Sequence, residues 1–187
     1  MAQTDERTVE WLKCAADAAY ACDTYGIIDD AQGLGDGRGV MRFRLWPAQV
    51  ALLWTLLTNR LVLILKARQL GISWICCWYA LWLCLFHPGK VVLLFSRGQD
   101  EANEMLRRVR VLYERLPEWM RQAAPALLKQ NMEEMAWANE SRIQSLPASP
   151  GSGRSFTASL AIMDEAAFMQ WASELYTAMK PTIDGGG

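Results

Sequence analysis

The sequence predicts an α/β domain built on a mainly parallel sheet that is flanked by helices. Three short apolar runs without alternation, at residues 61–65, 91–95 and 160–163, have the pattern of strands buried on both faces. Segments with helical spacing separate them, and strands that alternate with helices form parallel sheets. Ligands of such sheets bind at the carboxyl ends of the strands, so the residues after each run are candidates for a site.

The N-terminal 40 residues precede this pattern. Residues 7–22 have the spacing of one helix, and residues 26–39 contain five glycines, which indicates a loop or a linker. We therefore divide the chain into an N-terminal helix with a glycine-rich linker, residues 1–40, and one domain, residues 41–187.

The segments around the first run predict the helices of the domain. Pro47 is suited to the first turn of a helix that continues to Leu57. Residues 74–86 are thirteen consecutive apolar residues, which is too short for a bilayer span of about twenty and predicts a buried helix. The remaining predicted elements are helices over 99–116, 118–129 and most of 166–180, and a β-hairpin formed by 133–137 and 141–146.

Charge and cysteine usage narrow the class of protein. Residues 1–36 carry eight acids and two bases, whereas residues 37–99 carry eight bases and no acid. A basic tract of this kind suits a polyanionic partner, although solvated surface charge is the alternative for each single residue. The five cysteines form no CxxC pair, and with a single histidine they make a zinc site improbable. An odd cysteine count without a signal peptide predicts reduced thiols in a cytosol.

The loop after the first run is a candidate phosphate-binding site. Its sequence, KARQLGIS, retains the last glycine and the hydroxyl of the GxxxxGK[ST] pattern, at Gly71 and Ser73. Ile72 stands at the usual lysine position, so Lys66 or Arg68 would have to meet the phosphate charge. The backbone N–H groups can still surround phosphates, and Ser73 can still ligate magnesium. The alternative is an ordinary strand-to-helix turn with surface bases.

Two adjacent carboxylates end the third apolar run. Asp164 is placed to bind Mg²⁺, and Glu165 is placed to polarise an attacking water. The alternative is a helix start, where acidic residues interact favourably with the helix dipole. Together with the loop, the pair indicates a site that binds and hydrolyses ATP.

Two further side chains have chemistry that suits a nucleotide. Arg154 lies in the glycine-rich segment PGSGRS, from which an arginine can reach a γ-phosphate, often across a subunit interface. Gln49 has an amide that can recognise the edge of adenine. The alternatives are a solvent-exposed loop arginine and a glutamine on a helix surface.

These pieces, in this order, resemble the ATPase domain of phage terminase large subunits, the motors that package DNA into proheads. The similarity runs from Arg44 to the C-terminus and includes LWPAQ, KARQLGIS, VVLLFSRGQDEA, NESRIQSLPAS, GRS and IMDEAAF. It implies a P-loop NTPase fold of the ASCE type, ATP and Mg²⁺ as cofactors, and ATP-driven translocation of double-stranded DNA. It also implies a homo-oligomeric ring on the portal protein, a small terminase subunit as partner, and assembly in the cytoplasm of the bacterial host.

The resemblance also assigns roles by position. Gln49 matches the adenine-recognition glutamine, Asp164 and Glu165 match the magnesium aspartate and the catalytic glutamate, and Arg154 matches the loop that supplies an arginine finger in some members. Ser73 would be the second magnesium ligand. The phosphate-binding loop covers Lys66, Ala67, Arg68, Gln69, Leu70, Gly71, Ile72 and Ser73.

The chain departs from the family in two respects. Many members have a lysine or an arginine where this chain has Ile72. After the Asp-Glu pair the family continues into a coupling strand and a nuclease domain, whereas this sequence ends at Gly187, so we expect an incomplete ATPase domain without nuclease activity. A helicase-like DNA translocase, and a nucleotide-binding module without turnover, are the alternative functions.

Overall fold

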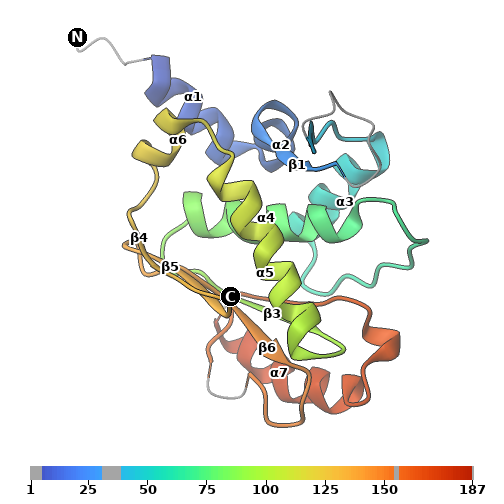
Figure 1. The fold of residues 1–187 in the computed structure, drawn as a ribbon. Coiled ribbons are helices and arrows are strands. Elements are labelled where there is room, and N and C mark those ends of the chain that lie inside the picture. The colour runs from blue at the N-terminus through green and yellow to red at the C-terminus, as the bar shows by residue number, and fades with distance from the viewer. Residues whose placement is uncertain (1–5, 31–38, 154–155, 187) are drawn as a thin grey trace.

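The computed structural model describes residues 6–30, 39–153 and 156–186, with the backbone alone for residues 182–186. Helices α4 and α5 cover one face of a five-stranded sheet, and α7 lies against the other face (Figure 1). In chain order the elements are α1 (Glu6–Ala16), α2 (Ala18–Tyr25), β1 (Ile27–Asp29), β2 (Val40–Arg42), α3 (Pro47–Thr58), α4 (Ile72–Phe86), β3 (Val91–Ser96), α5 (Gln99–Glu114), α6 (Glu118–Ala123), β4 (Leu127–Gln130), β5 (Glu134–Trp137), β6 (Arg142–Pro147), β7 (Leu160–Met163), the 3₁₀ turn η1 (Ala166–Phe168) and α7 (Ala172–Gly186).

The sheet is mixed. Its strand order is β4-β5-β6-β3-β7, and β3 pairs in parallel with β6 on one side and with β7 on the other. The β4–β5 and β5–β6 pairs are antiparallel, and β1 and β2 form a separate antiparallel pair. The expected parallel arrangement therefore holds for the β6–β3–β7 half, which is the half that carries the candidate site.

Strand β3 contributes to both hydrophobic clusters because its side chains alternate between the two faces of the sheet. Val92 and Leu94 pack with α4 and α5, whereas Leu93 and Phe95 pack with Leu175 and other residues on the α7 side. All four β3 side chains are fully buried. This two-sided burial explains why VVLLF has no polar position, and it confirms the prediction of a buried strand there.

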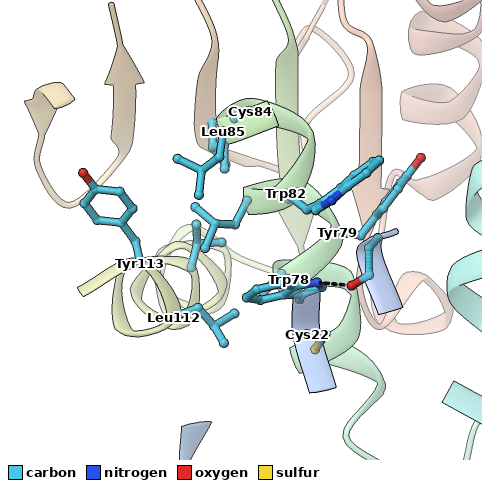
Figure 2. Packing of buried hydrophobic residues seen from close by; sticks show 14 of the residues in the cluster. Cys22, Trp78, Tyr79, Trp82, Cys84, Leu85, Leu112 and Tyr113 are labelled. Carbon is cyan, nitrogen blue, oxygen red and sulfur yellow. Dashed lines mark hydrogen bonds between the residues drawn. The ribbon is translucent and has the colours of Figure 1, made fainter. Parts of the chain in front are cut away.

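Two indole groups fix the N-terminal helices to α4. Trp78 Nε1 donates to the carbonyl of Ala18 at 2.9 Å (Figure 2). Trp82 Nε1 donates to the carbonyl of Cys14 at 2.8 Å. Each bond satisfies a buried indole N–H that would otherwise be costly to bury. The domain boundary at residue 40 stays a prediction, and the described residues on both sides of it share one hydrophobic cluster.

The first predicted strand, residues 61–65, is wrong. This segment forms no strand, and the side chains of Leu61, Leu63 and Leu65 are 69%, 94% and 102% exposed. The sheet ends at β7, and among the described residues no strand pairs with the outer edge of β7. An apolar run becomes a buried strand only where a neighbouring strand pairs with its backbone and a layer covers its side chains.

Two other predicted elements have different bounds. The single helix over 7–22 is divided at Asp17, whose side chain accepts hydrogen bonds from the first N–H groups of α2 and so caps a new helix. The helix over 118–129 ends at Ala123, because Pro125 follows and the chain then enters β4. Within the described residues, no helix is both long and apolar enough to cross a membrane.

Candidate functional site

The loop between residues 66 and 71 turns sharply into α4. Gln69 and Gly71 both have left-handed backbone conformations, with φ of 64° and 68°. Gly71 is the N-cap of α4, which makes the first N–H groups of this 15-residue helix point back toward the loop. The partial positive charge of a helix N-terminus favours an anion there.

Asp164 is held at the end of β7 by the neighbouring strand. Its backbone N–H donates to the carbonyl of Phe95 at 2.9 Å, and Ser96 Oγ donates to the carbonyl of Asp164 at 3.4 Å. Ser96 is buried at the carboxyl end of β3, so it lies at the same edge of the sheet as Asp164. Ser96 was not predicted as a site residue. It nevertheless has the same signal as Asp164, which is a polar side chain directly after a predicted strand.

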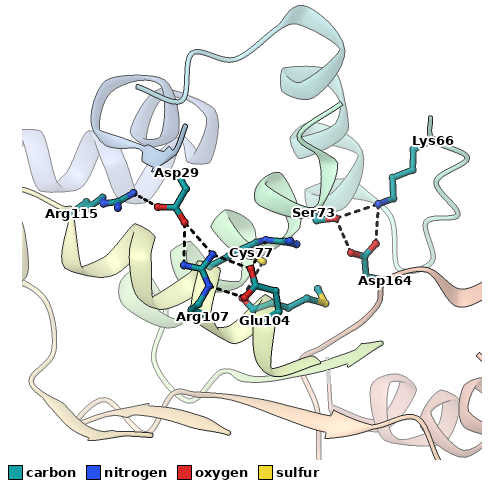
Figure 3. A network of polar contacts seen from close by, with 10 residues as sticks. Asp29, Lys66, Ser73, Cys77, Glu104, Arg107, Arg115 and Asp164 are labelled. Atoms are coloured by element: carbon teal, nitrogen blue, oxygen red, sulfur yellow. Dashed lines mark hydrogen bonds and ion pairs between the residues drawn. The ribbon is translucent and has the colours of Figure 1, made fainter. Parts of the chain in front are cut away.

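Three side chains from two distant segments meet between the loop and β7 (Figure 3). Ser73 Oγ donates to Asp164 Oδ2 at 2.7 Å. Lys66 Nζ donates to Ser73 Oγ at 3.2 Å and forms an ion pair with Asp164 Oδ1 at 3.0 Å. The side chains of Lys66 and Asp164 are 28% and 15% exposed, so the pair is only partly screened by water. We call these three residues the Lys66–Ser73–Asp164 triad.

The donor set of the triad suits a hard divalent cation. Ser73 and Asp164 offer a hydroxyl and a carboxylate oxygen, which are ligands that Mg²⁺ prefers, usually together with phosphate oxygens and water. The Lys66 ammonium already lies within 3.2 Å of both oxygen-bearing groups, which shows that this position stabilises a cation. The chemistry of the triad therefore fits Mg²⁺.

Glu165 lies beside the triad in a strained conformation. Its φ of 57° places a non-glycine residue in the left-handed region, at a cost of about 1–2 kcal/mol. Its backbone N–H donates to Asp164 Oδ1 at 3.1 Å, and its carboxylate is exposed without a hydrogen-bond partner among the described residues. A carboxylate that is held next to a cation site and kept free of partners is able to accept a proton or to orient water.

Gln49 is brought to the loop but is engaged by the chain itself. It is 4% exposed, its Oε1 accepts from the backbone N–H of Trp46, and its Nε2 donates to the carbonyl of Leu70, both at 2.9 Å. The amide is therefore buried against the loop, and its predicted role in adenine recognition stays a prediction.

The other predicted loop residues lie mainly at the surface. Ala67, Arg68, Gln69 and Leu70 are exposed, and Ile72 is half-buried at the first position of α4. Lys66 is thus the cation that reaches the carboxyl end of β7, and Arg68 is available to solvent. This arrangement favours Lys66 over Arg68 as the residue that meets a phosphate.

Arg154, the predicted arginine finger, lies outside the described residues, so its role stays a prediction. The preceding Gly153 is buried with a φ of 82°, and a Cβ atom there would lie 2.2 Å from the sulfur of Met179. Glycine is favoured here because the φ is left-handed, and Gly153 lies against Met179 of α7.

The thiol of Cys76, which is near the triad, is unreactive at neutral pH. Burial raises the pKa of Cys76 to about 12, and the nearby charge of Asp164 adds to this shift. Cys76 is therefore protonated at neutral pH and is a poor nucleophile or metal ligand.

A second polar cluster, which was not predicted, ties β1 to α5. Arg107 and Arg115 lie 3.0 and 2.9 Å from the carboxylate of Asp29 (Figure 3). Burial acts to raise the pKa of Asp29, but the hydrogen bonds from the two arginines outweigh it and hold this pKa below its ordinary value. Asp29 is 78 residues from Arg107 in the sequence, and the three residues carry no motif, so only the fold brings them together.

The fold is similar to a solved structure of the large terminase ATPase domain from Thermus phage P74-26. The TM-score is 0.52 at 21% sequence identity, and the similarity covers 63% of this chain and 52% of that chain. At this identity the likeness concerns the fold, and the matched part spans about half of the phage domain. No family model matches the chain.

Proposed function

We propose that this chain is a nucleotide-binding, ATP-hydrolysing domain of the terminase type, and that the Lys66–Ser73–Asp164 triad lies at its ATP site. The observation that carries the proposal is the 2.7 Å contact between Ser73 and Asp164, which are 91 residues apart in the chain. A hydroxyl on the first turn of a helix and an aspartate at the end of a parallel strand, joined in this way, are the parts that hold Mg²⁺ in P-loop ATPases.

The chain offers separate groups for the phosphates and for the cation. The N–H groups at the start of α4 and the ammonium of Lys66 provide donors and positive charge for phosphate oxygens. Ser73 and Asp164 would hold the cation. When bound, Mg²⁺ neutralises charge on the β- and γ-phosphate oxygens. The bonds of Ser96 and Phe95 to Asp164 keep its carboxylate at the edge of the sheet.

Glu165 is the residue that we propose to act on the attacking water. Its carboxylate is exposed and has no hydrogen-bond partner among the described residues, and its backbone N–H donates to Asp164 Oδ1. A water between this carboxylate and the γ-phosphate would be oriented and would lose its proton to Glu165. Arg154 would add positive charge from its glycine-rich loop, on the same or on a neighbouring subunit.

We further propose that the domain drives translocation of double-stranded DNA in viral packaging. The likeness to the Thermus phage ATPase domain and the basic tract over residues 37–99 support this proposal. The partners would be a small terminase subunit, a portal protein and further copies of the chain in a ring on the prohead, in the cytoplasm of the bacterial host.

One observation favours a second function, a nucleotide-binding module that does not turn over. Leu61, Leu63 and Leu65 lead into the phosphate loop but are exposed, so the loop is not braced by a strand on that side. A loop that is anchored at one end only can bind a nucleotide and still fail to align it for hydrolysis.

The test is magnesium-dependent ATP binding to the purified chain, followed by phosphate release with and without double-stranded DNA. The variant Glu165→Gln should keep ATP binding and lower hydrolysis by roughly 10²- to 10⁴-fold. Glu174→Gln, which changes an exposed glutamate on α7, is the matched control and should hydrolyse ATP normally. Binding without turnover in the unmodified chain would favour the second function, and no binding by a folded chain would rule out both.

A further inference from the structure

Gln49 stands out because a buried side-chain amide is committed to the backbone at both of its ends. It is one of four buried polar residues among those described, the others being Ser96, Ser141 and Ser145. Its Oε1 accepts from the N–H of Trp46, which lies just before α3, and its Nε2 donates to the carbonyl of Leu70 in the phosphate loop. The amide therefore links the start of α3 to the end of the loop, 21 residues further along the chain.

The same amide also lies under Gly71. A Cβ atom at Gly71 would lie 3.0 Å from Gln49 Nε2 and 3.6 Å from the ring of Phe43, which is itself buried. Gln49 and Phe43 thus form a surface on which the left-handed turn at Gly71 rests. Because Gly71 is the N-cap of α4, this surface sets the position of the first turn of that helix.

We propose that Gln49 is a positioning residue that fixes the carboxyl end of the phosphate loop, rather than a reader of the nucleotide base. This inference rests on the proposed ATP site. A glutamine recognises a base edge through one amide hydrogen and one carbonyl lone pair that face outward together. Here the amide is 4% exposed, so a base could reach those groups only after Gln49 has released Leu70 or Trp46.

The contribution of Gln49 to phosphate binding follows from the geometry at the start of α4. The carbonyl of Leu70 directly precedes the residue that caps α4, so holding it orients the N–H groups that would contact the phosphates. Without the bond, the loop samples conformations that do not bind, and the apparent affinity falls by the fraction of molecules in the competent state. The loss applies to any ligand that carries the phosphates, with or without a base.

The experiment compares two ligands that differ in the base. Magnesium-dependent binding of ATP and of inorganic tripolyphosphate is measured by calorimetry for the unmodified chain, Gln49→Ala and Gln49→Glu. We expect both variants to weaken both ligands by the same factor, roughly tenfold, as for loss of one hydrogen bond that leaves a buried partner unsatisfied. Weakened ATP binding with unchanged tripolyphosphate binding would overturn the inference and return Gln49 to base recognition.

A second measurement needs no ligand. Amide hydrogen exchange of the nucleotide-free chain should be faster over residues 66–73 in both variants, and unchanged over β3. Gln49→Glu keeps the acceptor for Trp46 but loses the donor to Leu70, so it should match Gln49→Ala in the loop while protecting the start of α3. Gln122→Ala, at an exposed glutamine on α6, is the control and should change neither region.

The two measurements separate the two proposals. If the unmodified chain binds neither ATP nor tripolyphosphate, the proposed ATP site is wrong, and hydrogen exchange alone decides the role of Gln49. Unchanged exchange over residues 66–73 in both variants would overturn the positioning role, whatever the binding data show. A uniform loss of protection throughout the chain would also overturn it, because Gln49 would then stabilise the whole fold and not the loop.

Discussion

The body of α4 and its N-terminal end differ in the contacts that hold them in place. Along most of its length α4 packs into the hydrophobic cluster that it shares with α2, α5 and β3, and the indole N–H groups of Trp78 and Trp82 donate to backbone carbonyls. The N-terminal end of α4 instead follows an exposed segment and a loop with two left-handed residues, and it is fixed by a few polar contacts. The contrast separates a stable scaffold from a site that is able to move.

The largest expected effect comes from breaking the scaffold. Trp78→Ala removes a side chain that is 2% exposed and takes the indole donor away from the carbonyl of Ala18. We expect a loss of about 3–5 kcal/mol in the free energy of unfolding, measured by urea denaturation. Trp54→Ala, at a tryptophan on α3 that is 54% exposed, is the matched control and should change it by about 0.5 kcal/mol at most. Equal effects would remove the distinction between the two regions.

Changes at the site should act on binding and leave the fold intact. Lys66→Ala should weaken nucleotide binding by roughly tenfold or more, because Lys66 is the cation at the triad, whereas Arg68→Ala should weaken it less because Arg68 is exposed. Titration with a fluorescent ATP analogue measures both. The opposite order would move the phosphate contact to Arg68.

The strain at Glu165 can be released at the expense of activity. Glu165→Gly should raise the free energy of unfolding by about 0.5–1 kcal/mol relative to Glu165→Ala, since glycine adopts a φ of 57° without penalty and alanine does not. Both variants should lose ATP hydrolysis. Equal stability of the two variants in thermal unfolding would show that the backbone of Glu165 is not strained.

The smallest expected effect concerns pH and the scaffold. Burial holds the pKa of His87 below its ordinary value of 6.5, and the charge of Lys90 acts in the same direction. The unfolded chain then binds a proton more readily, so stability should fall as the pH drops below about 6.5. His87→Gln should weaken the dependence of the unfolding midpoint on pH between pH 7.5 and 5.5. His87 is the single histidine of the chain, so an unchanged slope would assign this dependence to other groups.

The packed region was more predictable than the site region. The runs at β3 and β7, the apolar helix α4 and the hairpin of β5 and β6 each have a local pattern that agrees with their environment. Residues 61–65 have the same apolar pattern as β7, but strand formation depends on a partner that local sequence does not contain. The rule that strand ends share one edge of a sheet predicted that Ser73 and Asp164 lie close together. The two side chains do meet at 2.7 Å, although residues 61–65 before the loop form no strand.

Other contacts that side chains make between distant segments had no signal in the sequence. From the sequence, the amide of Gln49 was expected to be available to a base. No local signal shows that this amide is bonded to the carbonyl of Leu70. The ion pairs of Asp29 with Arg107 and Arg115 likewise depend on how β1 packs beside α5. Such contacts are set by tertiary packing, and one sequence carries little information about them.

Strand β3 gives the site a mechanical connection to the whole domain. Its last residues hold Asp164 by two hydrogen bonds, and its alternating side chains are locked into the layers on both faces of the sheet. Close-packed interiors are stiff and transmit displacement. A shift of Asp164 on nucleotide binding would thus displace β3 along its length, and β3 would pass the displacement to α5 and α7 together.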